Sequence, residues 1–305
     1  MTGMTDFITT ARWVDVWTIW FVLVDDAYQA LERRHGRWRR TGPPPRFHDS
    51  EVITVALIID TWFHGHEALG LSFLRQYHRH LFPHLPPDGW FNQRRTRLGP
   101  LIEQIRQVIT RQYGLIAADD PDRLIDSAPI PVATYQRAGD NRTVNGSAYF
   151  GIMSSRRAKL FGFRMHLTTT TRGVVETWLL APAGMHDSQV MPVVLEGASK
   201  RVVLGDGAYH NPTAAPVLAA RQVVVHAPPR RDSRKREPWS DELRRWVGKV
   251  RRRIETALSV LTTVFNVECP HARSLRGLVC RISTRILAYT LSFITGALLA
   301  QLIES

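Results

Sequence analysis

The segment Leu124–Val132, an apolar stretch that contains one acid, most constrains how this chain can fold. Its aliphatic residues indicate a buried strand, and Pro129 and Pro131 exclude a helix. The two prolines also predict that a central, fully hydrogen-bonded strand does not continue past Ser127. Burying an ionised carboxylate alone costs several kcal/mol of free energy. Asp126 therefore needs a charged partner or a metal ion.

Two later acids indicate what that partner is. Asp206 ends a second apolar strand, residues 202–206, and Glu255 lies in a long basic helix that includes residues 251–261. Acids at the strand ends of a mixed sheet can meet in the crevice there. Carboxylates that converge from different elements suit Mg²⁺, which prefers oxygen ligands. We therefore expect Asp126, Asp206 and Glu255 to form one metal-binding site.

The chain is strongly basic, with 305 residues, a formal net charge of +13 and an isoelectric point near 10.6. An excess of this size predicts a polyanionic partner, with nucleic acid first and an anionic membrane second. A hydrophobic content of 44% predicts a globular protein with a proper core. The two cysteines, Cys269 and Cys280, cannot form a disulfide framework, and no signal peptide is evident. We therefore expect a cytoplasmic, nucleoid-associated protein.

The run from Ile286 to Ile303 carries no formal charge and is just long enough to raise the question of a membrane span. It contains polar residues, among them Thr290, Ser292 and Gln301. We therefore predict a buried or partner-facing helix and no membrane partner.

The sequence pattern changes character near residue 120, which predicts two domains. We expect an all-helical N-terminal domain over residues 1–115 and an α/β domain over residues 120–305, in which helices flank a mixed sheet. The predicted helices span about residues 5–35, 52–63, 71–81, 100–113, 187–195, 211–220 and 241–265. Besides the opening segment, the predicted strands span about residues 161–169, 174–181, 201–205 and 222–227.

Three short blocks resemble the acidic motifs of DDE-type transposases from bacterial insertion sequences. The blocks are Leu124-Ile-Asp126, Val203-Leu-Gly-Asp206-Gly-Ala-Tyr209 and Arg251-Arg-Arg-Ile-Glu255. The resemblance covers about residues 120–290. The N-terminal helices, with Phe91-Asn-Gln-Arg-Arg95, are also similar to the leading region of such enzymes.

This resemblance implies a ribonuclease H-like catalytic core, with Asp126 on the first strand, Asp206 after the fourth strand and Glu255 on a late helix. It implies that these acids hold two Mg²⁺ or Mn²⁺ ions, about 3.5–4 Å apart in such sites. The implied substrate is double-stranded DNA with terminal inverted repeats. The implied reaction is hydrolysis of one strand by water, followed by attack of the freed 3′-hydroxyl on target DNA. We expect a homodimer, because two element ends must be handled together.

Basic residues near these blocks are candidate phosphate contacts: Lys249, Arg251, Arg252, Arg94 and Arg95. Many relatives carry a Tyr and a Lys where this chain has Gly248 and Thr262. Lys249, Arg252 or Arg253 can replace the missing Lys as a charge.

Several alternatives stay open at this point. A metal-dependent nuclease would use the same site without strand transfer, and a non-catalytic DNA-binding protein, such as a decayed transposase, would use the acids structurally. Asp187 rivals Asp206 as the second acid, although we favour a helix N-cap role for Asp187. The clustered histidines fit no closed four-ligand zinc pattern.

Overall fold

The computed structural model describes residues 13–38, 42, 45–117, 119–141, 143–153, 158–228 and 239–304. It divides into two compact units. The first unit consists of Met1–Leu115 together with Thr263–Ser305, and the second is Ile116–Thr262. The sequence analysis assigned residues 263–305 to the second domain, whereas here they pack with the N-terminal helices. In that unit, other helices cover the apolar surface of the C-terminal helix.

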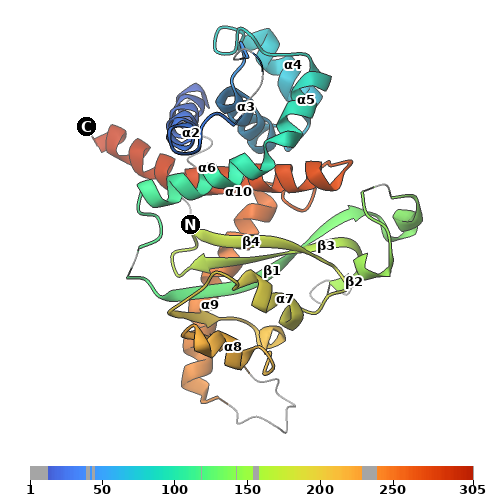
Figure 1. Cartoon of the computed structure of the whole chain (residues 1–305), viewed down its shortest axis with the longest axis vertical. Coiled ribbons are helices and arrows are strands. Elements are labelled where there is room, and N and C mark those ends of the chain that lie inside the picture. The colour runs from blue at the N-terminus through green and yellow to red at the C-terminus, as the bar shows by residue number, and fades with distance from the viewer. Residues whose placement is uncertain are drawn as a thin grey trace. The chain divides into compact units, whose positions relative to one another are not determined.

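Every regular element that the structure describes in the first unit is a helix. Its helices are α2 (Trp13–His35), α3 (Asp49–Trp62), α4 (Glu67–Tyr77), α5 (Asp88–Arg97), α6 (Gly99–Gln112) and α10 (Leu275–Glu304). The helix α5 occupies a segment for which the sequence pattern predicted no helix. Helices α6 and α10 lie side by side (Figure 1), and α10 also contacts α2, α3 and α5.

Helix α10 is long and apolar enough between Leu275 and Leu298 to cross a membrane by length and composition. In the fold, 83% of its most apolar window is buried. Trp20 of α2 donates a hydrogen bond from its indole nitrogen to the Thr295 hydroxyl of α10, at 3.0 Å. The predicted burial of this helix is confirmed, and packing against other helices accounts for its apolar sequence.

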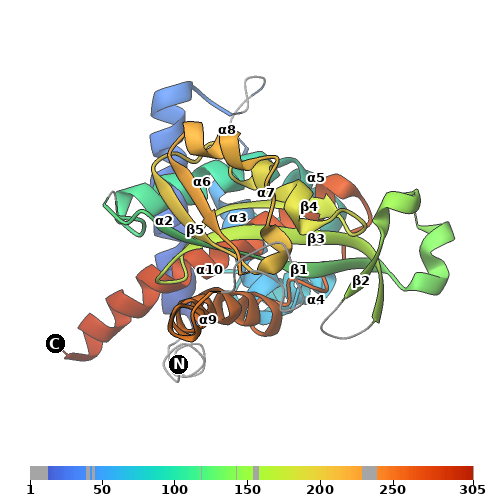
Figure 2. The same cartoon turned by 90° about the horizontal axis from the view of Figure 1, so that it is seen from below.

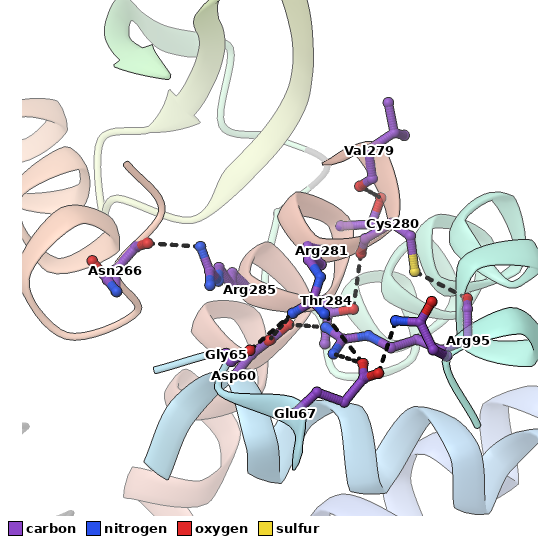
Figure 3. Close-up of polar contacts among 12 residues, drawn as sticks. Asp60, Gly65, Glu67, Arg95, Asn266, Val279, Cys280, Arg281, Thr284 and Arg285 are labelled. Atoms are coloured by element: carbon purple, nitrogen blue, oxygen red, sulfur yellow. Dashed lines mark hydrogen bonds and ion pairs between the residues drawn. The ribbon is translucent and has the colours of Figure 1, made fainter. Parts of the chain in front are cut away.

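A buried ionic cluster joins α10 to the other helices of the first unit (Figure 3). Its members are Asp60, Glu67, Arg95, Arg281 and Arg285. Arg95 forms ion pairs with both Asp60 and Glu67, and Arg281 lies 3.2 Å from Glu67. Arg285 donates hydrogen bonds to the carbonyl oxygens of Asn266, at 2.6 Å, and Cys269. Because buried charges must be paired, this cluster fixes how the helices meet.

Two of the predicted phosphate contacts belong to such ion pairs, so that prediction is wrong for them. Arg95 is 1% exposed and neutralised by the cluster. Arg94 donates from Nε to Asp49 Oδ1 at 2.8 Å and also to the carbonyl oxygen of Phe47. A guanidinium that is buried and paired with a carboxylate cannot also reach a DNA phosphate without breaking the helical packing.

The second unit is a six-stranded mixed sheet with helices on both faces. Its strands are β1 (Asp122–Ala133), β2 (Phe150–Met153), β3 (Ala158–Thr170), β4 (Val175–Pro182), β5 (Arg201–Leu204) and β6 (Val223–His226). Its helices are α7 (Asp187–Val194), α8 (Ala215–Ala220) and α9 (Asp241–Thr263).

The strand order is β2-β3-β1-β5-β6, and β4 also pairs with β3. Strand β1 is antiparallel to β3 and parallel to β5. Helices α7 and α8 cover one face and α9 lies on the other (Figure 2). The predicted α/β class, a mixed sheet preceded by a helical region, is confirmed.

Strand β1 continues past its prolines, but with a pairing partner on one side only, which agrees with the prediction that it is not a central, fully hydrogen-bonded strand there. It pairs with β3 through Pro129 and Pro131 as far as Ala133. Its pairing with β5 covers only Asp122–Leu124. Beyond that point one edge of β1 is open, and a strand edge tolerates the missing N–H of proline.

Replacing Asp60 by Asn should lower the free energy of unfolding by about 3–5 kcal/mol, because the buried arginines lose a counter-charge. Urea denaturation of the whole protein measures this. The matched control is Asp88→Asn, because Asp88 pairs with Arg75 while 48% of its side chain is exposed. That control should cost less than about 1 kcal/mol. Equal losses for the two variants would contradict a stabilising role for the cluster.

Candidate active site

Two of the predicted acids lie side by side where β1 and β5 run parallel. Leu124 pairs with Leu204 in the sheet. Two residues further along each chain come Asp126 and Asp206, at corresponding positions. Neighbouring strands lie about 4.8 Å apart, so the two carboxylates start from adjacent backbone positions.

Asp126 points to the face of the sheet that α9 covers. Its neighbour Ile125 packs into the core on the face of α7 and α8, and side chains alternate along a strand. Asp126 Oδ1 accepts a hydrogen bond from the backbone nitrogen of Ser127 at 2.8 Å. Asp126 Oδ2 lies 3.5 Å from Nη2 of Arg251, which belongs to α9.

The pKa of Asp126 depends on its burial and on the charged groups near it, which include the other two acids. Burial raises the pKa of Asp126 to about 6, while the Ser127 N–H and the Arg251 guanidinium act in the opposite direction. The negative charges of Asp206 and Glu255 raise this pKa further. All three predicted acids are therefore close enough to interact.

Asp206 is held by the turn that follows β5. Its Oδ1 accepts a hydrogen bond from the Ala208 nitrogen at 2.9 Å, which caps the short 3₁₀ helix η3 (Gly207–Tyr209). The residue before it must be glycine. A Cβ at Gly205 would lie 2.9 Å from Ile125 Cγ2 and 3.2 Å from the Tyr209 ring. Asp206 is thus packed tightly against β1.

Glu255 comes from α9, whose buried side faces the sheet. The buried residues of α9 are Val247, Ile254, Ala257 and Leu261. Glu255 is exposed beside this row, one turn after Arg251. Within the described residues, no group of three or more His, Cys, Asp or Glu side chains stands close enough together to hold a metal ion.

The donor chemistry nevertheless suits a hard cation. Asp126 and Asp206 each anchor one carboxylate oxygen on a backbone N–H, which orients the carboxylate. Carboxylate oxygens are the ligands that Mg²⁺ takes, with water completing its shell. Asp126, Asp206 and Glu255 therefore supply the kind of oxygen ligand that such an ion takes.

The basic residues of α9 differ in their surroundings. Arg251 is half-buried and is held against Asp126. Lys249 and Arg252 are exposed, and neither has an ion pair in the described part of the chain. These two side chains are accessible to an anionic partner.

Two buried residues behind the acids, His166 and Tyr209, are not among the site residues predicted from the sequence, and the third, Asp187, was predicted only as a rival of Asp206. His166 and Arg164 alternate with apolar residues along β3, and both are buried or half-buried. The predicted N-cap role of Asp187 is wrong by one residue. His186 is the N-cap of α7, and its Nδ1 accepts a hydrogen bond from the Ser188 nitrogen at 3.2 Å. Asp187 instead points to Arg164 and His166.

Comparison with known proteins identifies the family of this chain. The family model described as "Transposase DDE domain" matches residues 117–291, more than half of the chain. A cryo-EM structure of the piggyBac transposase synaptic complex with hairpin DNA aligns with a TM-score of 0.47 and 11% identity, over 93% of this chain and 74% of that one. The Mos1 transposase paired-end complex with the left transposon end aligns with a TM-score of 0.21 and 12% identity, over 79% of this chain and 85% of that one. A search of curated proteins finds no match.

Asp126→Asn should stabilise the protein at pH 8. The pKa of Asp126 rises from 3.8 to about 6 on folding, so the folded state binds more protons than the unfolded state between these values. Stability from this group is therefore lost as pH rises, up to about 3 kcal/mol above pH 6. The neutral amide avoids this loss.

Urea denaturation in the presence of a chelator at pH 8, 6 and 4 measures the difference. The gain should reach about 1–3 kcal/mol at pH 8 and vanish near pH 4. The control, Asp122→Asn at the other end of the strand, should change stability by less than about 0.5 kcal/mol. A gain that does not vary with pH would show that the Asp126 charge is not its cause.

Proposed function

Since the chain belongs to the transposase DDE domain family, we propose that it is the DNA transposase of an insertion sequence. On this proposal it binds terminal inverted repeats, nicks them and transfers the freed 3′-hydroxyl to target DNA. Asp126, Asp206 and Glu255 are its catalytic residues. The observation behind this proposal is that the charges of Asp206, at the end of β5, and of Glu255, on α9, both raise the pKa of Asp126 on β1.

The topology of the second unit supports a ribonuclease H-like core. The first strand lies centrally, with β3 antiparallel on one side and β5 parallel on the other. Asp126 is on this first strand and Glu255 is on the late helix α9. Asp206 follows the fifth strand instead of the expected fourth, because the short strand β2 adds one strand to the count.

Each residue has a separate task in the proposed reaction. When bound to these acids, Mg²⁺ or Mn²⁺ supplies Lewis-acid stabilisation of charge on the phosphate oxygens and lowers the pKa of water. Asp126 and Asp206 present carboxylates oriented by backbone N–H groups. Arg251 places a positive charge beside Asp126, where it can neutralise a scissile phosphate. Lys249 and Arg252 hold the flanking backbone.

The first unit offers a basic groove for DNA ends in place of Arg94 and Arg95. The groove has a volume of about 710 Å³ and lies between the C-terminal end of α2 and helix α6. Its cationic and aromatic lining includes Arg34, His35, Arg37, Trp38 and Arg111. The side chains of Arg34, Arg37 and Arg111 are exposed, and Trp38 is 42% exposed. Exposed guanidiniums next to an aromatic ring suit contact with phosphates and bases.

A homodimer that handles both element ends in the cytoplasm completes the proposal. The chemistry requires two ends to be processed together, and the net charge of +13 suits an extended polyanion.

Mg²⁺-dependent nicking of duplex DNA that carries the flanking inverted repeat tests the catalytic assignment. Wild type should cleave, and Glu255→Gln, Asp126→Asn and Asp206→Asn should each lose roughly 100-fold or more in rate, because each removes a metal-binding oxygen. Asp122→Asn is the matched control and should cleave like wild type. Equal cleavage by wild type and Glu255→Gln would remove Glu255 from the site. A pre-nicked end that is never joined to target DNA would leave a nuclease in place of a transposase.

The double variant Arg37→Ala, Arg111→Ala should weaken binding of duplex DNA and reduce the slope of log affinity against log salt by about 1 per lost phosphate contact. Electrophoretic mobility shifts at several salt concentrations measure both. The control is Lys200→Asn, since Lys200 is exposed at the amino end of β5 and has a φ of 50° that Asn tolerates. An unchanged salt slope in the double variant would exclude the groove as a phosphate contact.

A further inference from the structure

A chain of buried polar side chains runs behind the acids on the face of the sheet that α7 covers. Tyr209 and His166 are both 0% exposed, and the Tyr209 hydroxyl lies 3.1 Å from His166 Nδ1. The side chain of Ser127, the residue after Asp126, also acts on the Tyr209 hydroxyl and opposes the effect of burial on its pKa. The hydroxyl of one tyrosine therefore connects β1 to β3 directly beside the first acid.

The other nitrogen of His166 faces an acid at the start of α7. His166 Nε2 lies 3.9 Å from Asp187 Oδ1 and forms no hydrogen bond within the described residues. Arg164 Nη1 lies 3.5 Å from the same carboxylate oxygen. Burial and the Arg164 charge lower the pKa of His166 to about 4, so its imidazole is neutral at neutral pH.

The arrangement of charges indicates one tautomer. A neutral imidazole has one donor and one acceptor nitrogen. The Asp187 carboxylate can only accept when ionised, so the proton of His166 belongs on Nε2. His166 Nδ1 is then the acceptor, and Tyr209 donates its hydroxyl proton to it. In this tautomer Tyr209 donates to His166 Nδ1, and the proton on His166 Nε2 faces the Asp187 carboxylate at 3.9 Å without a hydrogen bond.

Tyr209 and the second acid, Asp206, belong to the same short turn. Asp206 and Tyr209 are the two ends of one 3₁₀ turn, in which the Tyr209 nitrogen donates to the Asp206 carbonyl oxygen at 3.1 Å. The Asp206 carboxylate is anchored on Ala208, inside the same turn. Gly205, directly before the turn, is packed so closely against Ile125 and Tyr209 that a Cβ would not fit there. This close packing restricts movement of the turn. Fixing the Tyr209 ring therefore fixes the direction of the Asp206 carboxylate.

We propose that Tyr209, His166 and Asp187 are positioning residues, which hold the η3 turn so that Asp206 presents its carboxylate to the divalent cation. This inference rests on the proposed function in one respect, namely that Asp206 binds metal. The three residues touch neither metal nor DNA. They act through Asp206 in the way that outer-shell partners act on metal ligands, whose loss typically costs 10–100-fold in metal affinity or activity.

The experiment measures Mn²⁺ binding to the full-length protein by calorimetry, without DNA. Tyr209→Phe removes only the hydroxyl and keeps the buried ring. It should bind Mn²⁺ about 10-fold or more weakly than wild type while keeping its melting temperature within a few degrees. The matched control is Tyr149→Phe, a half-buried tyrosine of the same unit, which should bind like wild type.

A pair of substitutions at His166 separates positioning from packing. His166→Leu fills the buried space without polar atoms and should weaken Mn²⁺ binding as Tyr209→Phe does. His166→Asn restores an acceptor near the position of Nδ1 and should recover part of the affinity. If His166 had only a packing role, the order would be reversed, and His166→Leu would keep more Mn²⁺ affinity than His166→Asn, because a buried strand accepts Leu better than Asn.

The possible outcomes are distinct. Wild-type affinity for Mn²⁺ in Tyr209→Phe would overturn the inference. Wild-type protein that binds Mn²⁺ but cuts no DNA would overturn the proposed function, while the comparison of variants would still decide this inference. Wild-type protein that binds no Mn²⁺ would overturn both.

Discussion

Burial of a carboxylate, with added repulsion from other carboxylates, is the constraint on which the candidate active site depends. The parallel register of β1 and β5 places Asp126 and Asp206 at matching positions, and α9 adds the charge of Glu255. Together with burial, this repulsion disfavours the ionised form of Asp126, whose pKa rises to about 6. The fold opposes the repulsion with backbone N–H groups and with Arg251, which lies 3.5 Å from Asp126.

The arginines of this chain serve two separate purposes. Some are interior structural groups, among them Arg95, Arg106, Arg123 and Arg285, each less than 2% exposed. Others, such as Arg37 and Arg252, are exposed. Both kinds contribute equally to the formal net charge of +13. The net charge therefore predicts a polyanionic partner but says nothing about which arginines would contact it.

The two faces of the sheet carry different residues of the candidate active site. On one face, Asp126 meets Arg251 of α9. On the other, Tyr209 and His166 form a buried link from β1 and β3 towards Asp187 of α7. Because side chains alternate along a strand, Asp126 and Ser127 serve opposite faces while sharing one backbone. A strand buried on both faces can in this way carry a reactive group and its support at adjacent positions.

Periodicity and isolated charges in apolar segments are local properties. From them the sequence predicts most helices and strands of the second unit and marks Asp126, Asp206 and Glu255 as candidate site residues. Tertiary structure alone decided that residues 263–305 pack with the N-terminal helices and that Arg95 is buried against Asp60. It also decided that β1 extends past Pro131 and that Tyr209 meets His166. Each of these depends on a partner far away in the chain. No local pattern records such a partner, because burial and pairing exist only once distant segments have come together.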